Sequence, residues 1–265
     1  MPASAASLKS CSIVTAGNWR ESTAADVLAV LTRMRDAALE NVSCRSDRQP
    51  TVLRVEDKLS GSPAVWLHTE EPTTAVIIVD VGTRDWCNLA YQFGHELGHV
   101  FANSWTWDAK PRNPSQWLEE AVVESFSIRS LGKLADSWRI SPPFPQDNAY
   151  ANAIRDYRER LLQSDRQEAD ERHGAAGLTA WYTGRADYLS SHGGVDDAKP
   201  AVPAVVKLLE EDDAAVADIG AMNRWLERTG VPLGDYLQRW QASCVELGLS
   251  GTLPRRLRES LLPRG

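Results

Sequence analysis

The sequence predicts an α+β protein in which a small N-terminal mixed sheet precedes a mostly helical C-terminal lobe. Two observations carry this prediction. Short segments rich in β-branched residues, separated by Ser, Gly and Pro, lie before residue 81. Beyond residue 85 the apolar residues recur at helical spacing, and turn-forming segments interrupt them at 110–115, 141–147 and 190–200.

The predicted elements follow in order along the chain. Residues 1–20 are rich in Ser and Ala, and we expect them to be disordered. Within 21–42, apolar residues at helical spacing follow a Ser-Thr start signal and predict an amphipathic helix. Three strands are then expected at 51–55, 64–68 and 74–80.

Composition excludes several classes of protein. The net charge of -7 argues against nucleic acid and anionic membrane surfaces as partners, since both need clustered Lys and Arg. The longest apolar run, 75–79, is far shorter than the roughly 20 residues that cross a bilayer. The four cysteines form no CxxC pair, so we expect reduced thiols and a cytoplasmic protein. Export without a cleaved signal peptide is the alternative.

The segment HELGH, residues 95–99, has the spacing of a metal site. On a helix, His95 and His99 project within roughly 40° of each other, so both imidazoles can reach one ion. Glu96 lies off that axis, where it could contact a water on the metal without being a ligand. Gly98 costs about 0.8–1.0 kcal/mol within a helix, which indicates that another element packs closely there. The alternative is that both histidines are ordinary hydrogen-bonded residues.

A second helix, predicted to begin after Pro114-Ser115 and to end at Gly132, offers a third ligand. Glu120 and Glu124 lie one turn apart on one stripe, which suits a ligand followed by a carboxylate that orients a ligand histidine. Glu119 is expected to point elsewhere, toward Val123 and Phe126. A solvated acidic face is the alternative for these glutamates.

These motifs resemble those of the gluzincin metallopeptidases, in which HExxH is completed by a glutamate on the next helix. Residues 95–99 match the first motif, and WLEEAVVESF at 117–126 is similar to the aminopeptidase-type segment, with Glu120 in the ligand position. The Glu120-Ala121 pair also fits the ImmA/IrrE-like peptidases. A metzincin would need Gly at 102 and His at 105, but the chain has Ala102 and Trp105.

The resemblance implies a zincin-like fold with one zinc ion per chain and a peptide or protein substrate. Glu96 would take a proton from a zinc-bound water, whose pKa falls from 15.7 toward roughly 7, and return it to the leaving nitrogen. For the oxyanion, Tyr182 is favoured over Tyr188 and His192 as the second electrophile. An edge strand at 74–80 would pair with substrate. The alternative is a zincin-fold binding or regulatory protein that holds zinc without cleaving.

We therefore expect one catalytic domain over 21–265. Its parts are a helix with a small sheet, the metal-binding helices and a helical lobe, at 21–83, 84–133 and 134–265.

Overall fold

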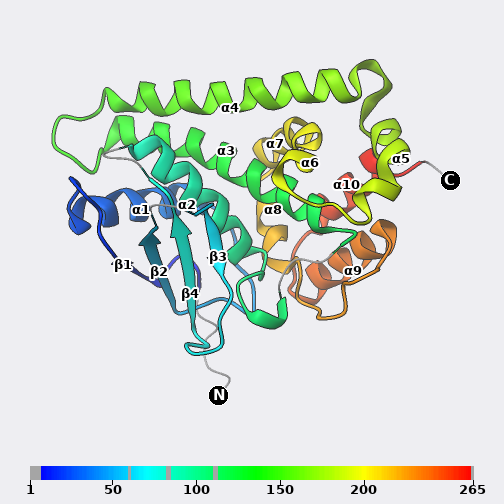
Figure 1. Ribbon diagram of the computed structural model, residues 1–265, viewed down its shortest axis with the longest axis horizontal. Coiled ribbons are helices and arrows are strands. Elements are labelled where there is room, and N and C mark those ends of the chain that lie inside the picture. The colour runs from blue at the N-terminus through cyan, green and yellow to red at the C-terminus, as the bar shows by residue number, and fades with distance from the viewer. Residues whose placement is uncertain (1–6, 59–60, 82–84, 110–112, 264–265) are drawn as a thin grey trace.

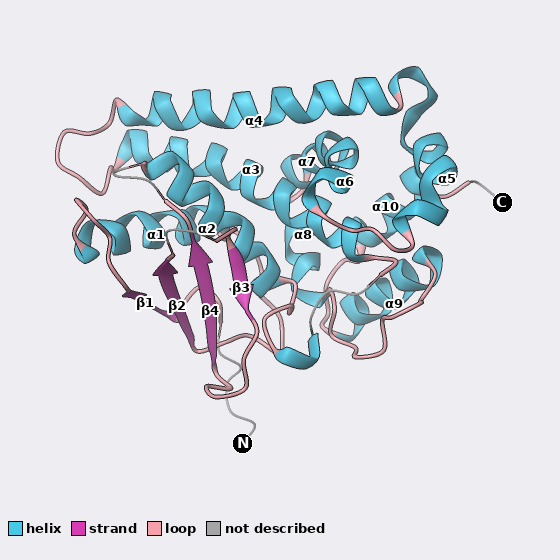
Figure 2. Ribbon diagram, in the orientation of Figure 1, coloured by secondary structure: helices cyan, strands magenta, loops and turns pink. Residues whose placement is uncertain are grey.

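The structure, a computed structural model, describes residues 7–58, 61–81, 85–109 and 113–263 (Figure 1). It is an α+β protein, with a mixed four-stranded sheet at one end of a mostly helical body, as the sequence predicts (Figure 2). The strands are β1 (Ser12–Ala16), β2 (Val52–Asp57), β3 (Ala64–Trp66) and β4 (Thr74–Val79). Their order across the sheet is β1-β2-β4-β3.

Strand β1 corrects the prediction that residues 1–20 are disordered. It pairs in parallel with β2, from Ser12 opposite Val52 to Ala16 opposite Glu56. The segment is short and half exposed, so its own pattern carries little signal. Its order comes from the hydrogen bonds to β2 and from the packing of helix α1 (Ala24–Ala38) against it. Residues 1–6 of the predicted segment lie outside the described residues.

The edge of the sheet also differs from the prediction. Strand β4, expected to be the edge strand, lies between β2 and β3, and all of its residues are buried. Its continuous apolar run is typical of a strand covered on both faces. Strand β3 runs antiparallel to β4, with Val65 opposite Ile77, and forms the edge. A peptide that adds to this side of the sheet would therefore meet β3.

Helix α3 (Gln116–Ile140) is the centre of the helical body and packs against α1, α2, α4, α6 and α7. It does not end at Gly132, as the sequence predicted, but continues to Ile140, past the expected boundary at 133. A β-carbon at position 132 would lie 3.2 Å from Nε of Arg158 in α4. The glycine thus permits a close helix contact within α3, and the packing outweighs its low helix propensity.

The other helices complete the body. Helix α2 (Trp86–Phe101) follows β4 and packs against β3, β4, α1 and α3, and α4 (Tyr150–Arg172) runs along α3 (Figure 1). The remaining α-helices are α5 (Gly177–Leu189), α6 (Val195–Ala198), α7 (Val202–Glu211), α8 (Asp213–Ala217), α9 (Leu233–Glu246) and α10 (Thr252–Leu261). Short 3-10 turns lie at Trp107–Ala109, Gly174–Ala176, Lys199–Ala201 and Asp218–Ala221.

Two further observations concern the cysteines and the length of the helices. All four cysteines, Cys11, Cys44, Cys87 and Cys244, are free thiols. Among the described helices, none combines the length and the apolar character needed to cross a bilayer.

Candidate metal centre

Helices α2 and α3 run in opposite directions and bring the three predicted ligands together. His95 and His99 lie one turn apart on α2, with ring centroids 5.1 Å apart, and α3 carries Glu120. The helices approach closely at Gly98, where a β-carbon would lie 2.8 Å from Cβ of Val123. The close packing expected at Gly98 is therefore present, and it brings Glu120 within reach of both imidazoles.

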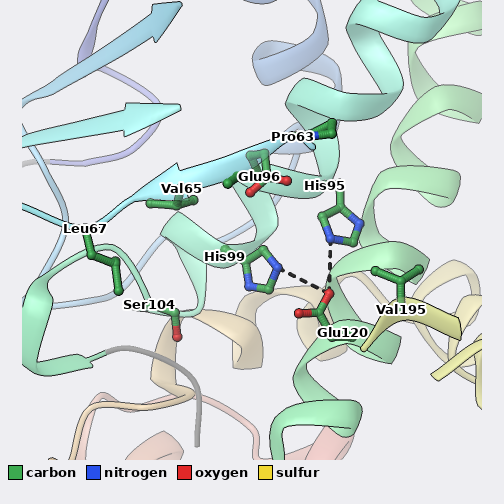
Figure 3. A pocket seen from close by; sticks show the side chains of 10 residues that line it. Pro63, Val65, Leu67, His95, Glu96, His99, Ser104, Glu120 and Val195 are labelled. Carbon is green, nitrogen blue, oxygen red and sulfur yellow. Dashed lines mark ion pairs between the residues drawn. The ribbon is translucent and has the colours of Figure 1, made fainter. Parts of the chain in front are cut away.

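The three side chains lie close enough together to hold one metal ion (Figure 3). Glu120 Oε2 lies 3.3 Å from His95 Nε2 and 3.5 Å from His99 Nε2. One ligand atom from each residue lies within 4.8 Å of the other two. Ligands bound to zinc at 2.0–2.2 Å in a tetrahedral arrangement are about 3.4 Å apart. Two imidazole nitrogens with one carboxylate oxygen also form a donor set that zinc accepts.

Each histidine is oriented through its other ring nitrogen by a glutamate of α3. His95 Nδ1 lies 2.8 Å from Glu124 Oε2, and His99 Nδ1 lies 2.8 Å from Glu119 Oε1. A carboxylate that accepts the Nδ1 proton directs Nε2 toward the ion, which is the usual support for a metal-binding histidine. Glu124 therefore makes the contact that the sequence analysis expected of it.

The contact of Glu119 with His99 corrects the prediction that Glu119 points away from the site. Its physical reason is the antiparallel packing of the two helices. One turn forward on α2, from His95 to His99, corresponds to about one turn backward on α3, from Glu124 to Glu119. Glu120 lies between these two supports. A helical wheel drawn for α3 alone cannot show in which direction α2 runs, so it cannot show that Glu119 meets His99.

Two further residues hold these glutamates and were not identified from the sequence. The Tyr91 hydroxyl donates to Glu124 Oε1 at 2.8 Å, and the Asn223 amide donates to Glu119 Oε2 at 2.7 Å. Tyr91 precedes His95 by four residues on the same helix, so its position on this face was readable from spacing. Asn223 is distant in sequence, and no local pattern indicates its role.

Burial and charge act in opposition on the side chains of the centre. Burial lowers the pKa of His95, but hydrogen bonds to Glu120 and Glu124 outweigh it and raise the pKa to about 10. For Glu120 burial acts in the other direction and raises the pKa, but the interactions with His99 and His95 outweigh it and bring the pKa well below its usual range. Binding of a cation through the two Nε2 atoms would therefore release protons, as is usual for histidine sites.

Glu96 lies beside the three ligands and lines the same cavity (Figure 3). It is 4% exposed, and burial raises the pKa of its carboxyl group, which accepts a hydrogen bond from the backbone of Val65 in β3. It is not part of the cluster of potential ligands found among the described residues. Its expected role as a proton acceptor stays a prediction.

The cavity is a cleft between the edge strand and the helical lobe. Its wall on the sheet side is formed by Pro63, Ala64, Val65 and Leu67, and Val195 at the start of α6 lies on the other side (Figure 3). A second, more apolar hollow adjoins it. That hollow is lined by Ser62, Pro63, Tyr91, Gln92, His95, Glu96 and Val195. Val195 lines both hollows, and the sequence analysis did not select it.

Tyr182, predicted to stabilise the oxyanion, is not among the residues that line either hollow. Its ring stacks on Trp117, with centroids 5.7 Å apart, because α5 lies against the N-terminal end of α3. Tyr188 and His192, the other candidates, stack on each other. Tyr91 is the tyrosine among the described lining residues, and its hydroxyl donates to Glu124.

Comparison with models of known protein families found no match, and no curated protein matched the sequence. The resemblance to gluzincins therefore rests on the two motifs at 95–99 and 117–126, and it stays a prediction.

Proposed function

We propose that this chain is a zinc-dependent metallopeptidase that hydrolyses peptide bonds. The observation that carries the proposal is the convergence of His95, His99 and Glu120 on one point in a cleft, with Glu96 beside them and the edge strand β3 along the wall. Each of these parts has a use in peptide hydrolysis, and together they leave room for a substrate next to the ligands.

His95 and His99, through Nε2, and Glu120, through a carboxylate oxygen, would hold one zinc ion. When bound, zinc supplies Lewis acidity that lowers the pKa of water and polarises a carbonyl oxygen. Glu124 and Glu119 would accept the Nδ1 protons of the two imidazoles, which leaves both Nε2 atoms to bind the ion. Three protein ligands leave a fourth position for water or substrate, as in catalytic zinc sites.

Glu96 is the residue that moves the proton. Its burial raises the carboxyl pKa, which brings its proton affinity closer to that needed at neutral pH. It takes one proton from the attacking water, whose oxygen forms the new bond to the carbonyl carbon. It then gives that proton to the leaving nitrogen as the C–N bond breaks, so the products are a carboxylic acid, which keeps the second proton of the water, and an amine.

The edge strand supports a peptide as the substrate. The outer side of β3 carries backbone groups that β4 does not use, and an extended peptide can pair with them with little regard to sequence. Preference would then come from the two adjoining hollows beside the ligands. The hollow lined by Tyr91 and Val195 is mainly apolar, so we expect an apolar substrate side chain there.

The test begins with finding a substrate. Wild-type protein loaded with zinc is incubated with a denatured proteome, and new peptide N-termini are identified by mass spectrometry. Glu96→Gln keeps the size of the side chain but cannot accept the proton, so we expect it to keep its zinc and lose roughly 10²–10⁴-fold in rate.

Glu70→Gln is the matched control, because Glu70 is exposed on the segment between β3 and β4. It should cleave like the wild type. Identical fragments from wild type and Glu96→Gln would overturn the proposed role of Glu96. A wild type that carries zinc and cleaves nothing would favour a protein that binds zinc without catalysis.

A further inference from the structure

Asn223 connects the C-terminal part of the chain to the metal centre. It is 1% exposed, and its backbone has φ of +57°, a conformation that asparagine adopts more readily than most residues. Its Nδ2 donates to Glu119 Oε2 at 2.7 Å and to Ser104 Oγ at 2.9 Å. Asn223, which lies 104 positions after Glu119, thus donates to the Glu119 carboxylate oxygen that does not contact His99.

The orientation of the Asn223 amide is determined by Tyr236 on α9. The Tyr236 hydroxyl donates to Asn223 Oδ1 at 2.6 Å. Burial raises the pKa of Tyr236 well above its ordinary value, so the hydroxyl keeps its proton. With Oδ1 accepting from Tyr236, the NH₂ group must face Glu119, whose carboxylate only accepts. The result is one directed chain of contacts, Tyr236 to Asn223 to Glu119 to His99.

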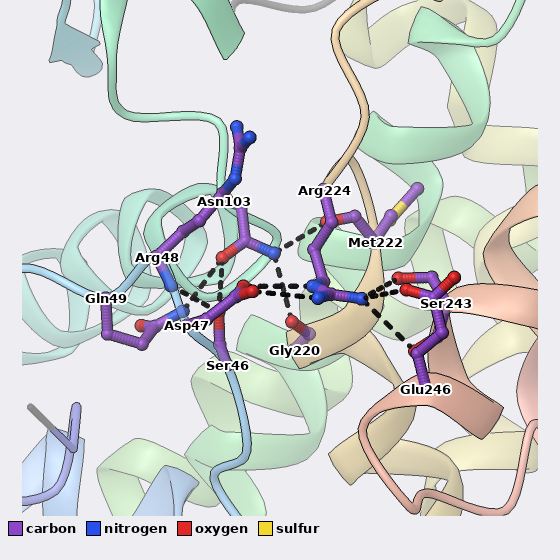
Figure 4. A network of polar contacts seen from close by, with 10 residues as sticks. All are labelled: Ser46, Asp47, Arg48, Gln49, Asn103, Gly220, Met222, Arg224, Ser243 and Glu246. Carbon is purple, nitrogen blue, oxygen red and sulfur yellow. Dashed lines mark hydrogen bonds and ion pairs between the residues drawn. The ribbon is translucent and has the colours of Figure 1, made fainter. Parts of the chain in front are cut away.

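The backbone before Asn223 is held by Asn103, which follows α2 (Figure 4). Asn103 Nδ2 donates to the carbonyl oxygens of Gly220 and Met222, at 3.0 and 2.7 Å. Asn103 is itself buried. The backbone that leads to Asn223 is therefore held by a residue just after the helix that carries His99.

The residue after Asn223 is held from two sides (Figure 4). Arg224 pairs with Asp47 at 2.8 Å and with Glu246 at 3.0 Å. These contacts join the segment before β2 to α9. Asn223 thus lies between two anchored neighbours, and its side chain has little freedom to leave Glu119.

We propose that Asn223 is a positioning residue for His99, so that zinc affinity depends on how the segment 219–228 packs against the metal-binding helices. This inference rests on the metal site of the proposed function. Without Asn223, Glu119 Oε2 loses its amide donor and the carboxylate can turn. Oε1 of Glu119 then no longer fixes the orientation of the His99 ring through Nδ1. The His99 Nε2 atom is therefore less well oriented to bind the ion.

The test compares two Asn→Gly variants. Asn223→Gly removes the amide and still allows a positive φ, so the backbone is not strained. Asn41→Gly is the matched control, because Asn41 has the same φ of +57° and is exposed. Zinc dissociation constants are measured by competition with a chromophoric chelator. We expect affinity to fall roughly 10–100-fold in Asn223→Gly and to stay unchanged in Asn41→Gly.

A reciprocal exchange separates positioning from general packing. Asn223→Asp removes the donor and places two carboxylates together, whereas Glu119→Gln supplies an amide that can donate in the opposite direction. Each single variant should weaken zinc binding. The double variant keeps the total charge and a hydrogen bond at this place, and it should recover most of the affinity. The visible spectrum of bound Co²⁺ should change in the single variants and return toward that of the wild type in the double variant.

The outcomes distinguish this inference from the proposed function. A wild type that binds no zinc overturns both. If wild type binds zinc and His99→Ala abolishes binding, while Asn223→Gly binds like Asn41→Gly, only the inference fails. A folded double variant whose affinity and Co²⁺ spectrum resemble those of the worse single variant also overturns it. If Asn223→Gly does not fold, the reciprocal exchange of residues 119 and 223 tests the inference without it.

Discussion

His95 and His99 are supported in the same way by α3, but the two supporting glutamates depend on different parts of the chain. Glu124, which holds His95, is itself held by Tyr91, one turn before His95 on the same helix. Glu119, which holds His99, is held by Asn223 from the C-terminal lobe. One support is local, and the other spans more than a hundred residues.

The difference shows how one short motif can join two regions of a protein. The local support is complete once α2 and α3 pack together. The distant support also requires the segment around Asn223 and helix α9 to be in place. His95 should therefore be ordered whenever the helix pair is formed, whereas the order of His99 should follow the packing of the C-terminal lobe.

The largest effect is expected when one of the two compared histidines is replaced. His95→Ala or His99→Ala leaves two ligands of three, so each variant should lose its zinc, which metal analysis of the purified protein would show. His192→Ala is the control, because His192 is exposed outside the site. Full zinc content in either ligand variant would mean that the ion lies elsewhere.

The next variants break one support at a time. We expect Glu119→Ala and Glu124→Ala each to weaken zinc binding roughly 10–100-fold, because either loss frees one imidazole. Hydrogen exchange of the metal-free protein then sharpens the comparison. The backbone amides of 219–228 should lose protection in Glu119→Ala, because the buried side chain of Asn223 loses its acceptor on Glu119. They should keep their protection in Glu124→Ala. Equal loss of protection in both variants would contradict the division into local and distant supports.

A smaller effect is expected at Tyr91. Tyr91→Phe removes one hydroxyl and leaves Glu124 still bonded to His95. The free energy of unfolding should fall by about 1 kcal/mol, the typical net value of one hydrogen bond. Zinc affinity should fall less than in Asn223→Gly, because the local helix pair still restrains Glu124. Denaturant titration measures the free energy of unfolding, and the chelator competition measures the zinc affinity. A larger loss of zinc affinity in Tyr91→Phe than in Asn223→Gly would contradict the prediction.

The last prediction concerns the stability of the fold rather than zinc binding, and its site is Asp165 of α4, which is buried near Glu124 and has no described hydrogen-bond partner for Oδ2. Burial, with Glu124 nearby, raises the pKa of Asp165 to about 7. Its unfolded value is about 3.9, so its stabilising contribution is present below about pH 3.9 and is lost as the pH rises toward 7. Thermal unfolding should show Asp165→Asn gaining stability relative to wild type between pH 4 and 8. A difference that does not change with pH would contradict the shift.

The parts of the centre that could be predicted are those fixed by spacing along one helix. The pairing of His95 with His99 and the offset of Glu96 follow from the period of α2, and the close packing at Gly98 follows from the cost of a glycine within a helix. The contact of Glu124 follows from the stripe that it shares with Glu120 on α3. These expectations need only one helix and the knowledge that another packs beside it.

The parts that could not be predicted depend on how elements pack. The direction of α2 relative to α3 decides that Glu119 meets His99, and the position of α5 against Trp117 keeps Tyr182 out of the lining of the cleft. The fold shows the same division. The mixed sheet was predicted, but its order was not, because short strands do not encode which neighbour they pair with. Gly132 was misread since its contact with Arg158 is tertiary.

The three-residue length of β3 has a consequence for the behaviour of the protein in solution. An open sheet edge invites pairing between copies of the same chain, and long flat edges lead to aggregation. β3 offers so few backbone groups that such pairing would be weak. The same shortness would limit how many hydrogen bonds the proposed peptide substrate could form, and selectivity would then come mostly from the side chains around the cleft. Weak pairing between copies and dependence on side-chain recognition would thus have one structural origin.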